Sequence, residues 1–174
     1  MKENRAIYPG SFDPVHFGHL DVIMRSTQIF SSVIVAVAAS KAKGPLFSPE
    51  ERIQMLRDSL GENPAIQILP LEGLLVDFAR EHGVFTVIRG LRAVSDFEFE
   101  FQMALMNRKL EPRLETVYLT PKEDYTYLSS RIVKEVALFG GDVGQFVPES
   151  AAARLRQSLI HPHVAEQARL RQKI

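Results

Sequence analysis

Short apolar runs and segments of helical period alternate along the whole chain. The runs are rich in β-branched residues and predict strands that helices cover on both faces. They lie at residues 6–8, 33–38, 65–69, 85–88 and 116–119. Between them, apolar residues recur every three or four positions, which predicts helices. These helices are expected at residues 20–30, 49–60, 74–82, 96–110 and 129–139, with a further helical segment at 151–159.

Repeated strand-then-helix units with short connections predict a parallel sheet with right-handed crossovers. The expected fold is α/β: a Rossmann-like, doubly wound, five-stranded parallel sheet with helices on both faces, followed by C-terminal helices. A length of 174 residues suits one compact domain. We therefore expect a single domain over residues 1–174, with its core at about 5–159 and a helical tail at 150–174.

Charge and cysteine content narrow the class of protein. Lys and Arg total 21, as do Asp and Glu, and a neutral chain lacks the positive field of a non-specific nucleic-acid binder. Cysteine is absent, which excludes disulfides and thiolate nucleophiles. The start lacks the apolar stretch of a signal peptide, and the longest apolar run, residues 33–39, is too short for a bilayer. We expect a soluble cytoplasmic protein that binds neither nucleic acid nor membranes.

The loop after the first predicted strand carries the densest group of candidate residues. Gly10 lets the backbone approach a ligand, and Ser11 adds an N–H and a hydroxyl. Gly18 lies where the next helix opens, so His16 and His19 can donate to phosphate oxygens near the positive end of the helix dipole. The alternative is a turn with two incidental histidines, one of them in the core. Strand, turn and helix together favour a nucleotide site at the carboxyl edge of the sheet.

Arg89, Gly90 and Arg92 follow the fourth predicted strand and are expected at the same edge. Arginine suits bidentate recognition of phosphate, and Gly90 allows close approach of the backbone. The alternative is that the arginines pair with nearby carboxylates, namely those of Asp96, Glu98 or Glu100. The shared edge favours a binding function.

Three weaker signals follow other strands. Ser129 and Ser130, in the segment 125–131, begin a helix; they are either simple caps or a second phosphate-binding helix N-terminus. Lys43 lies in the loop after the second strand, either solvated or facing the ligand. Residues 72–75 are expected to line the same cleft, and Asp13 is expected to brace its loop rather than bind a metal.

One apolar stripe has a simpler interpretation. Phe97, Phe101, Ala104 and Leu105 lie at helical spacing, which predicts a core or subunit contact rather than a cofactor site.

These motifs together resemble the bacterial phosphopantetheine adenylyltransferase family. The resemblance rests on residues 9–14 with Gly18 and His19, on residues 88–92, and on residues 129–130 with 133–135. It covers about residues 5–159 in order. The first motif marks the wider nucleotidyltransferase superfamily, whereas the Arg-Gly-Leu-Arg block at 89–92 and the strand end at 38–40 are more specific.

The resemblance implies a reaction, a cofactor and an assembly. ATP and 4′-phosphopantetheine would give dephospho-coenzyme A and pyrophosphate with Mg²⁺, in a homohexamer that coenzyme A inhibits by feedback. The catalytic residues would be His19, Lys43, Arg92 and Ser130. The ATP-binding residues would be Gly10, Ser11, His19, Gly90, Leu91, Arg92, Glu100, Tyr125, Thr126, Tyr127, Leu128, Ser129, Ser130 and Arg131. The phosphopantetheine-binding residues would be Ser11, Lys43, Leu75 and Arg89.

The residue types agree with that chemistry. The attacking phosphate oxygen is already anionic near neutral pH, so no general base and no covalent enzyme intermediate are needed. The site has only to align two polyanions and neutralise charge at the α-phosphorus. Two alternatives are a nicotinamide or nicotinate mononucleotide adenylyltransferase and a non-catalytic nucleotide sensor.

Overall fold

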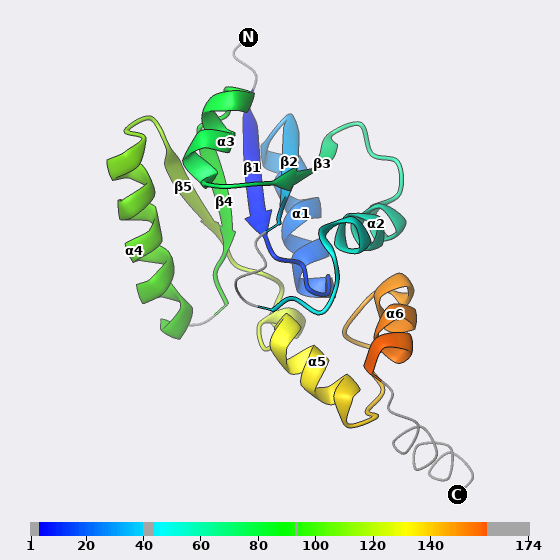
Figure 1. The fold of residues 1–174 in the computed structure, drawn as a ribbon. Helices are drawn as coiled ribbons and strands as arrows, with labels where there is room; N and C mark the ends of the chain where they lie inside the picture. Colours follow the sequence, from blue (N-terminus) through cyan, green and yellow to red (C-terminus); the bar gives the residue numbers. More distant parts are fainter. Residues whose placement is uncertain (1–3, 40–43, 93, 160–174) are drawn as a thin grey trace, which may run out of the picture.

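The computed structural model describes residues 4–39, 44–92 and 94–159. Its centre is a five-stranded sheet in which all neighbouring strands are parallel, in the order β3-β2-β1-β4-β5 (Figure 1). The strands are β1 (Arg5–Gly10), β2 (Ser32–Ala38), β3 (Ile66–Leu71), β4 (Thr86–Gly90) and β5 (Glu115–Leu119). The predicted α/β fold is thereby confirmed.

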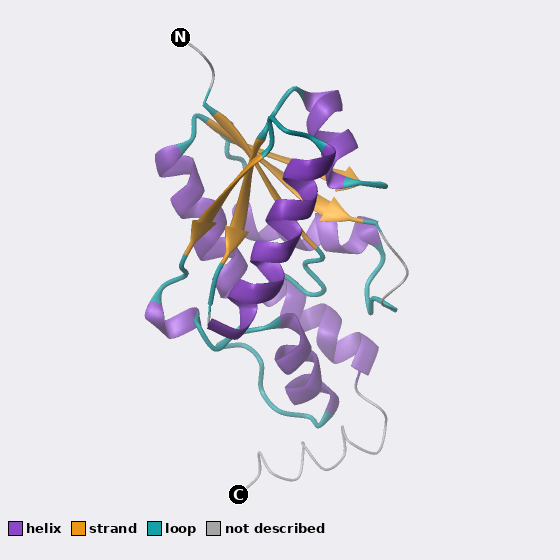
Figure 2. Cartoon of the chain, turned by 90° about the vertical axis from the view of Figure 1, so that its left-hand side faces the viewer, coloured by secondary structure: helices purple, strands orange, loops and turns teal. Residues whose placement is uncertain are grey.

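Helices lie on both faces of this sheet (Figure 2). They are α1 (Phe17–Ile29), α2 (Pro49–Leu60), α3 (Leu75–His82), α4 (Val94–Leu110), α5 (Ser130–Leu138) and α6 (Glu149–Leu159). A short 3₁₀ helix, η1 (Glu123–Tyr125), was not predicted. α6 agrees with the helical composition of 151–159, and the rest of the predicted tail lies outside the described residues.

Local sequence explains where the helices begin and end. At α2 the Ser48 hydroxyl accepts from Glu51 N and the Glu51 carboxylate accepts from Ser48 N, which forms a capping box. α3 ends at Gly83, which has the left-handed φ of 63° that a residue without Cβ adopts at low cost. α1 begins three residues earlier than predicted, because His16 serves as its N-cap.

Alternate residues of the strands supply two hydrophobic cores, one on each face of the sheet. Ala6 of β1 belongs to the larger core, which α1, α2, α5 and α6 cover. The neighbouring Ile7 belongs to the smaller core, which contains Phe78 and Ala79 of α3. Both strand faces are therefore buried, as the continuous apolar runs predicted. Among the described residues, no helix has the length and apolar character needed to cross a membrane.

A buried carboxylate ties α3 to the end of α4. Glu111 is 5% exposed and accepts from Arg80 Nε and Arg113 Nε, each at 2.8 Å. Arg80 also donates to the Leu110 carbonyl at 2.7 Å. Hydrogen bonds from Arg113 and Arg80 lower the pKa of Glu111 from its usual 4.5 to about 2.

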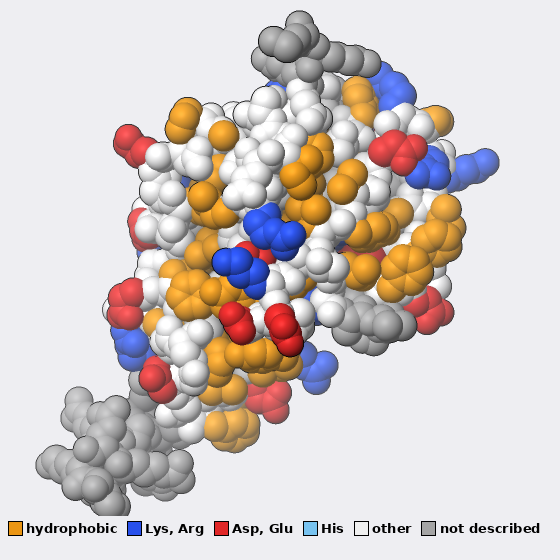
Figure 3. All heavy atoms as spheres, turned by 180° about the vertical axis from the view of Figure 1, so that it is seen from behind, with side chains coloured by type: hydrophobic (Ala, Val, Ile, Leu, Met, Phe, Trp, Pro, Cys, Tyr) orange, Lys and Arg blue, Asp and Glu red, His pale blue; other side chains and the backbone are white. Residues whose placement is uncertain are grey.

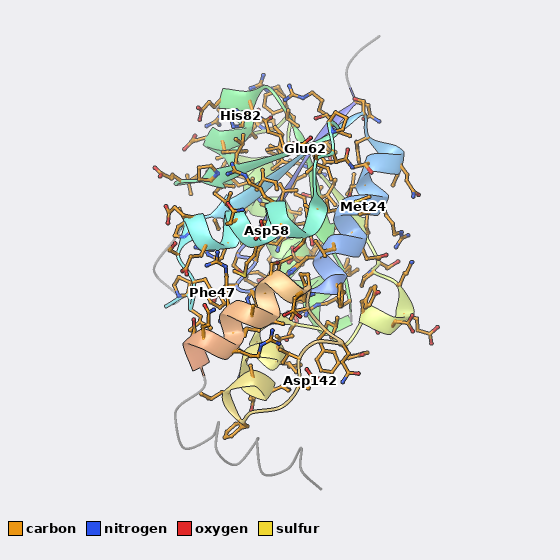
Figure 4. All side chains as sticks on the ribbon, turned by 90° about the vertical axis from the view of Figure 1, so that its right-hand side faces the viewer. Met24, Phe47, Asp58, Glu62, His82 and Asp142 are labelled. Carbon is orange, nitrogen blue, oxygen red and sulfur yellow. The ribbon has the colours of Figure 1, made fainter. Side chains whose placement is uncertain are left out.

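This cluster should make stability depend on pH in the acid range. Because the pKa of Glu111 is lower in the folded state, its contribution is complete above about pH 4.5 and is lost as the pH falls towards 2. The variant Glu111→Gln should therefore be less stable than wild type at pH 7, and the gap should narrow in that window. Denaturant titrations at several pH values measure this, with Asp58→Asn on the exposed surface of α2 (Figure 4) as control. A stability difference between wild type and Glu111→Gln that does not change with pH would contradict the lowered pKa of Glu111.

Candidate active site

A cavity of about 570 Å³ opens at the carboxyl ends of β1 and β4. The chain runs from β1 outward to β3 and then returns to place β4 on the other side of β1. Open α/β sheets bind ligands at such a reversal of strand order. The lining residues are Tyr8, Pro9, Gly10, Ser11, His16, Gly18, His19, Val22, Arg89, Gly90, Arg92, Phe99, Glu100, Pro121, Tyr125, Ser129, Ser130 and Arg131.

The turn after β1 is held in a conformation that is uncommon for a bulky residue. Phe12 has φ of 50° and is fully buried. Its ring packs edge-on against Tyr8, with centroids 5.6 Å apart, and against His19 at 5.0 Å. A Cβ on Gly10 would lie 2.8 Å from the Phe12 ring. The packing of Phe12 therefore favours glycine at position 10, independently of any ligand.

The two histidines of the turn stack on each other at the cavity wall. Their ring centroids are 3.6 Å apart and their planes differ by 22°. The His16 backbone N–H donates to His19 Nδ1 at 3.2 Å. With Nδ1 as acceptor, a neutral His19 carries its proton on Nε2 and can donate it to a ligand.

Both histidines are neutral at physiological pH without a ligand. Burial, aided by the charge of Arg92, lowers the pKa of His16 from 6.5 to about 3. Burial also lowers the pKa of His19 well below its usual value, with contributions from His16, Arg92 and Arg89. One alternative placed a histidine in the core; His16 is indeed 4% exposed, yet it still lines the cavity.

Arg89 combines the two alternatives considered from the sequence. It lines the cavity and also pairs with Glu100, through Nε at 2.7 Å and Nη2 at 2.5 Å. Its Nη1 donates to the Pro9 carbonyl at 2.8 Å. These contacts fix the orientation of Arg89 and use three of the five N–H donors of its guanidinium within the described part of the chain. Arg92 lies on the same side and donates to the Leu128 carbonyl at 2.6 Å.

The start of α5 forms another part of the cavity wall. Ser129 caps the helix by accepting from Ile132 N at 3.2 Å, and Ser130 donates to the Pro14 carbonyl at 2.8 Å. Both serines line the cavity. The two alternatives for these serines, a simple cap and a helix N-terminus able to bind phosphate, are therefore compatible with each other.

Asp13 braces its loop, as the sequence predicted. Its carboxylate accepts from Leu46 N at 3.0 Å, from Phe47 N at 2.9 Å and from Lys134 Nζ at 2.7 Å. It therefore joins the turn after β1 both to the segment before α2 and to α5.

Several predicted site residues lie outside the lining of the cavity. These are Leu75, Leu91, Thr126, Tyr127 and Leu128. Leu75 packs against the smaller core, and Leu128 is buried but offers its carbonyl to Arg92. Lys43 lies outside the described residues. Their roles stay predictions.

Sequence reasoning missed five residues of the lining, namely Tyr8, Pro9, Val22, Phe99 and Pro121. Tyr8 is buried in β1, and burial raises the pKa of its phenol to about 12. Pro121 follows β5, so its position after a strand could have indicated it. Phe99 gives no such signal, because it belongs to a helix with apolar residues all round.

Comparison with known proteins agrees with this geometry. A family model described as cytidylyltransferase-like matches residues 7–136. The phosphopantetheine adenylyltransferase of Methylococcus capsulatus is 55% identical over 150 residues, covering 86% of this chain and 93% of that protein. The enzyme of the same name from Heliobacterium modesticaldum is 51% identical over 152 residues, covering 87% and 90%. The Plasmodium falciparum nicotinic acid mononucleotide adenylyltransferase shares the fold, with a TM-score of 0.64 at 15% identity, covering 89% of this chain and 95% of that one.

The parallel sheet, its cavity at the strand reversal and the match over most of the chain define a nucleotidyltransferase. Within that class, identity of about half the residues over nearly the whole chain is decisive. The chain belongs to the phosphopantetheine adenylyltransferase family.

Proposed function

We propose that this chain transfers the adenylyl group of ATP to 4′-phosphopantetheine, forming dephospho-coenzyme A and pyrophosphate. One observation carries the proposal: the cavity brings His19, Arg89, Arg92 and the N-terminus of α5 around one space. The single carboxylate in its lining, Glu100, is paired with Arg89. Such a site suits two polyanions, and the names of the relatives supply the acceptor.

The reaction needs alignment rather than proton removal. A phosphate oxygen of phosphopantetheine attacks the α-phosphorus of ATP, forming a new P–O bond. The bond from that phosphorus to the bridging oxygen breaks, and pyrophosphate leaves with the electron pair. His19 Nε2–H and Arg92 would donate to the triphosphate as charge develops there. Ser11 would contact ATP and the acceptor phosphate, and Arg89 and Lys43 would hold that phosphate.

Mg²⁺ is proposed to arrive with ATP. Among the described residues, no group of three or more His, Asp or Glu could hold a metal ion. Mg²⁺ prefers oxygen ligands and keeps several waters, so the β- and γ-phosphates would hold it and it would neutralise part of their charge. Metal binding is thus expected to depend on the nucleotide rather than on the protein alone.

Pyrophosphate release tests the proposed function. ATP and Mg²⁺ are combined with 4′-phosphopantetheine, with nicotinamide mononucleotide or with no acceptor. We expect release only with phosphopantetheine, and a chelator should abolish it without changing the melting temperature of the free protein. Release with the mononucleotide alone would show the alternative transferase. Binding of ATP without release would show a nucleotide sensor.

Self-association is proposed to cover α4. This helix exposes a group of large apolar side chains, each more than 40% accessible: Phe97, Phe99, Phe101, Met103, Leu105, Met106 and Leu110. In Figure 2 no other described element covers its outer side, and in Figure 3 apolar side chains gather over it on the right. Phe97, Phe101 and Leu105 of the predicted stripe therefore lie outside the core of this chain, which supports the predicted subunit contact. A homohexamer is the proposed assembly.

The variant Met106→Glu should disrupt that assembly. A carboxylate in the middle of an apolar interface would be buried without a partner, which disfavours association. Sedimentation velocity should show a hexamer for wild type and smaller species for the variant. Ile132→Glu, at a 50% exposed position of α5, is the control and should sediment as wild type. A monomeric wild type, or an unchanged variant, would contradict the proposed interface.

Coenzyme A is proposed as a competing ligand of the same cavity. It shares the adenine and pantetheine parts of dephospho-coenzyme A, so inhibition should be relieved by raising both substrates. The cytoplasmic location stays an expectation from the composition.

A further inference from the structure

Arg52, in the first turn of α2, is a buried cation held by backbone carbonyls. Its side chain is among the largest that are fully buried, with 1% of the residue exposed. Nη1 donates to Ser11 O at 2.6 Å and to Ala38 O at 2.9 Å. Nε donates to Phe47 O at 3.0 Å and to Ser48 O at 3.3 Å. Every hydrogen-bond acceptor of Arg52 among the described residues is therefore a main-chain oxygen.

The four carbonyls belong to three segments at the ligand-binding edge of the sheet. They come from the turn after β1, from the last residue of β2 and from the residues that lead into α2. Asp13 holds the segment before α2 through the Leu46 and Phe47 N–H groups. Arg52 and Asp13 therefore hold these segments together through hydrogen bonds to their backbones.

The carbonyl of Ser11 connects Arg52 to the cavity. It belongs to the peptide that joins Ser11 to Phe12, whose φ of 50° is unfavourable for a residue with a Cβ. Fixing that peptide orients Ser11, which lines the cavity. It also fixes the backbone of Phe12, whose ring contacts His19. A route of direct contacts thus runs from Arg52 through Ser11 and Phe12 to His19.

A buried guanidinium is a costly way to fill space. Removing a cation from water carries a large desolvation penalty, and an apolar side chain of similar volume is often more stabilising. Arg52 Nη2 adds to that cost, since it is buried and has no hydrogen-bond partner among the residues that the structure describes. Core packing therefore does not explain an arginine here, whereas the fixed fork of donors explains how three segments are held in one geometry.

We propose that Arg52 is a positioning residue for adenylyl transfer, setting the Ser11–Phe12 peptide and, through the Phe12 ring, the His19 imidazole. It acts from behind the cavity wall, and it is absent from the lining of the cavity. The inference rests on the proposed function, because it requires that Ser11 and His19 handle the phosphates.

Turnover of Arg52 variants tests the inference. In Arg52→Met the stem remains but the donors are lost; in Arg52→Lys the charge remains on a single nitrogen. At a temperature where circular dichroism shows both variants folded, kcat should fall about 100-fold for methionine and less for lysine, as expected for a small misplacement of reacting groups. Arg80→Met is the matched control, because Arg80 also ties elements together but at α3 and the end of α4. It should lower the melting temperature and leave kcat unchanged.

Two further measurements separate positioning from stability. The imidazole NMR resonances of His19 should shift in Arg52→Lys and stay in place in Arg80→Met. Added guanidinium ion should restore part of the kcat of Arg52→Ala, because it can occupy the vacated space. Wild-type kcat in folded Arg52→Lys and Arg52→Met, with only the melting temperature lowered, would overturn the inference. A wild-type protein that does not turn over phosphopantetheine would instead overturn the proposed function.

Discussion

Replacing His19 by asparagine should lower kcat by about 10²–10³-fold, the usual cost of removing one donor to transition-state charge. His19 lies at the cavity wall with Nδ1 occupied by the His16 backbone N–H, so its useful proton is on Nε2. The oxygen of an asparagine can replace Nδ1 as acceptor but cannot replace the Nε2 donor. The loss should appear in kcat with ATP and phosphopantetheine, while the melting temperature changes little.

Two companion variants show whether the lost donor causes this effect. His19→Ala removes both nitrogens and should lower turnover at least as far, with a larger loss of stability from the broken cap contact. His82→Asn is the matched control at the other end of the molecule, since His82 lies far from Phe47 in Figure 4. It should keep wild-type kinetics. Near-normal kcat in His19→Asn would remove the imidazole donor from the mechanism.

Replacing Arg92 by methionine should cost about 10³-fold in kcat, comparable to other arginines that stabilise transferring phosphoryl groups. Arg92 lines the cavity and is oriented by the carbonyl of Leu128. Its charge also lowers the pKa of His16 and His19. The variant should therefore raise both histidine pKa values, which NMR titration of the imidazoles measures alongside the kinetics.

The position of the charge matters as much as its presence. Arg92→Lys keeps a cation but loses the planar fork of donors, so it should recover only part of the activity. Arg108→Met is the control. It removes an exposed cation near the end of α4 that pairs with Glu115 of β5. It should leave kcat and both histidine pKa values unchanged. Histidine pKa values that do not move in Arg92→Met would contradict the electrostatic coupling.

Much of the fold could be predicted because both faces of the sheet are buried. The continuous apolar run at 33–38 lacks the alternating polar residues of a strand with one solvent-facing side, so it predicts a strand buried on both faces. It forms β2 at Ser32–Ala38. The helices predicted at 49–60 and 74–82 lie within one residue of α2 and α3, and the residues at their ends, Ser48, Glu51 and Gly83, act locally. η1 was missed because its backbone depends on contacts with distant residues, such as that of Asp21 with Lys122 N.

The candidate site was predictable where it follows strand ends and not elsewhere. His16, His19, Arg89 and Ser130 were found because parallel strands bring their carboxyl ends to one edge. The sequence offered Glu100 as only one of three possible partners for the arginines, because the choice of carboxylate depends on where α4 packs. The role of Arg52 was equally hidden, since its partners are backbone oxygens 41, 14, 5 and 4 positions away along the chain.

Product analysis of one mixed reaction tests the central claim most directly. ATP, Mg²⁺, 4′-phosphopantetheine and nicotinamide mononucleotide at equal concentrations are incubated with the full chain, and the products are identified by mass spectrometry. The proposed function predicts dephospho-coenzyme A and pyrophosphate in equal amounts, with the mononucleotide recovered intact and with far less product when His19→Asn is used for the same time. A dinucleotide formed from the mononucleotide, or AMP released without dephospho-coenzyme A, would contradict it.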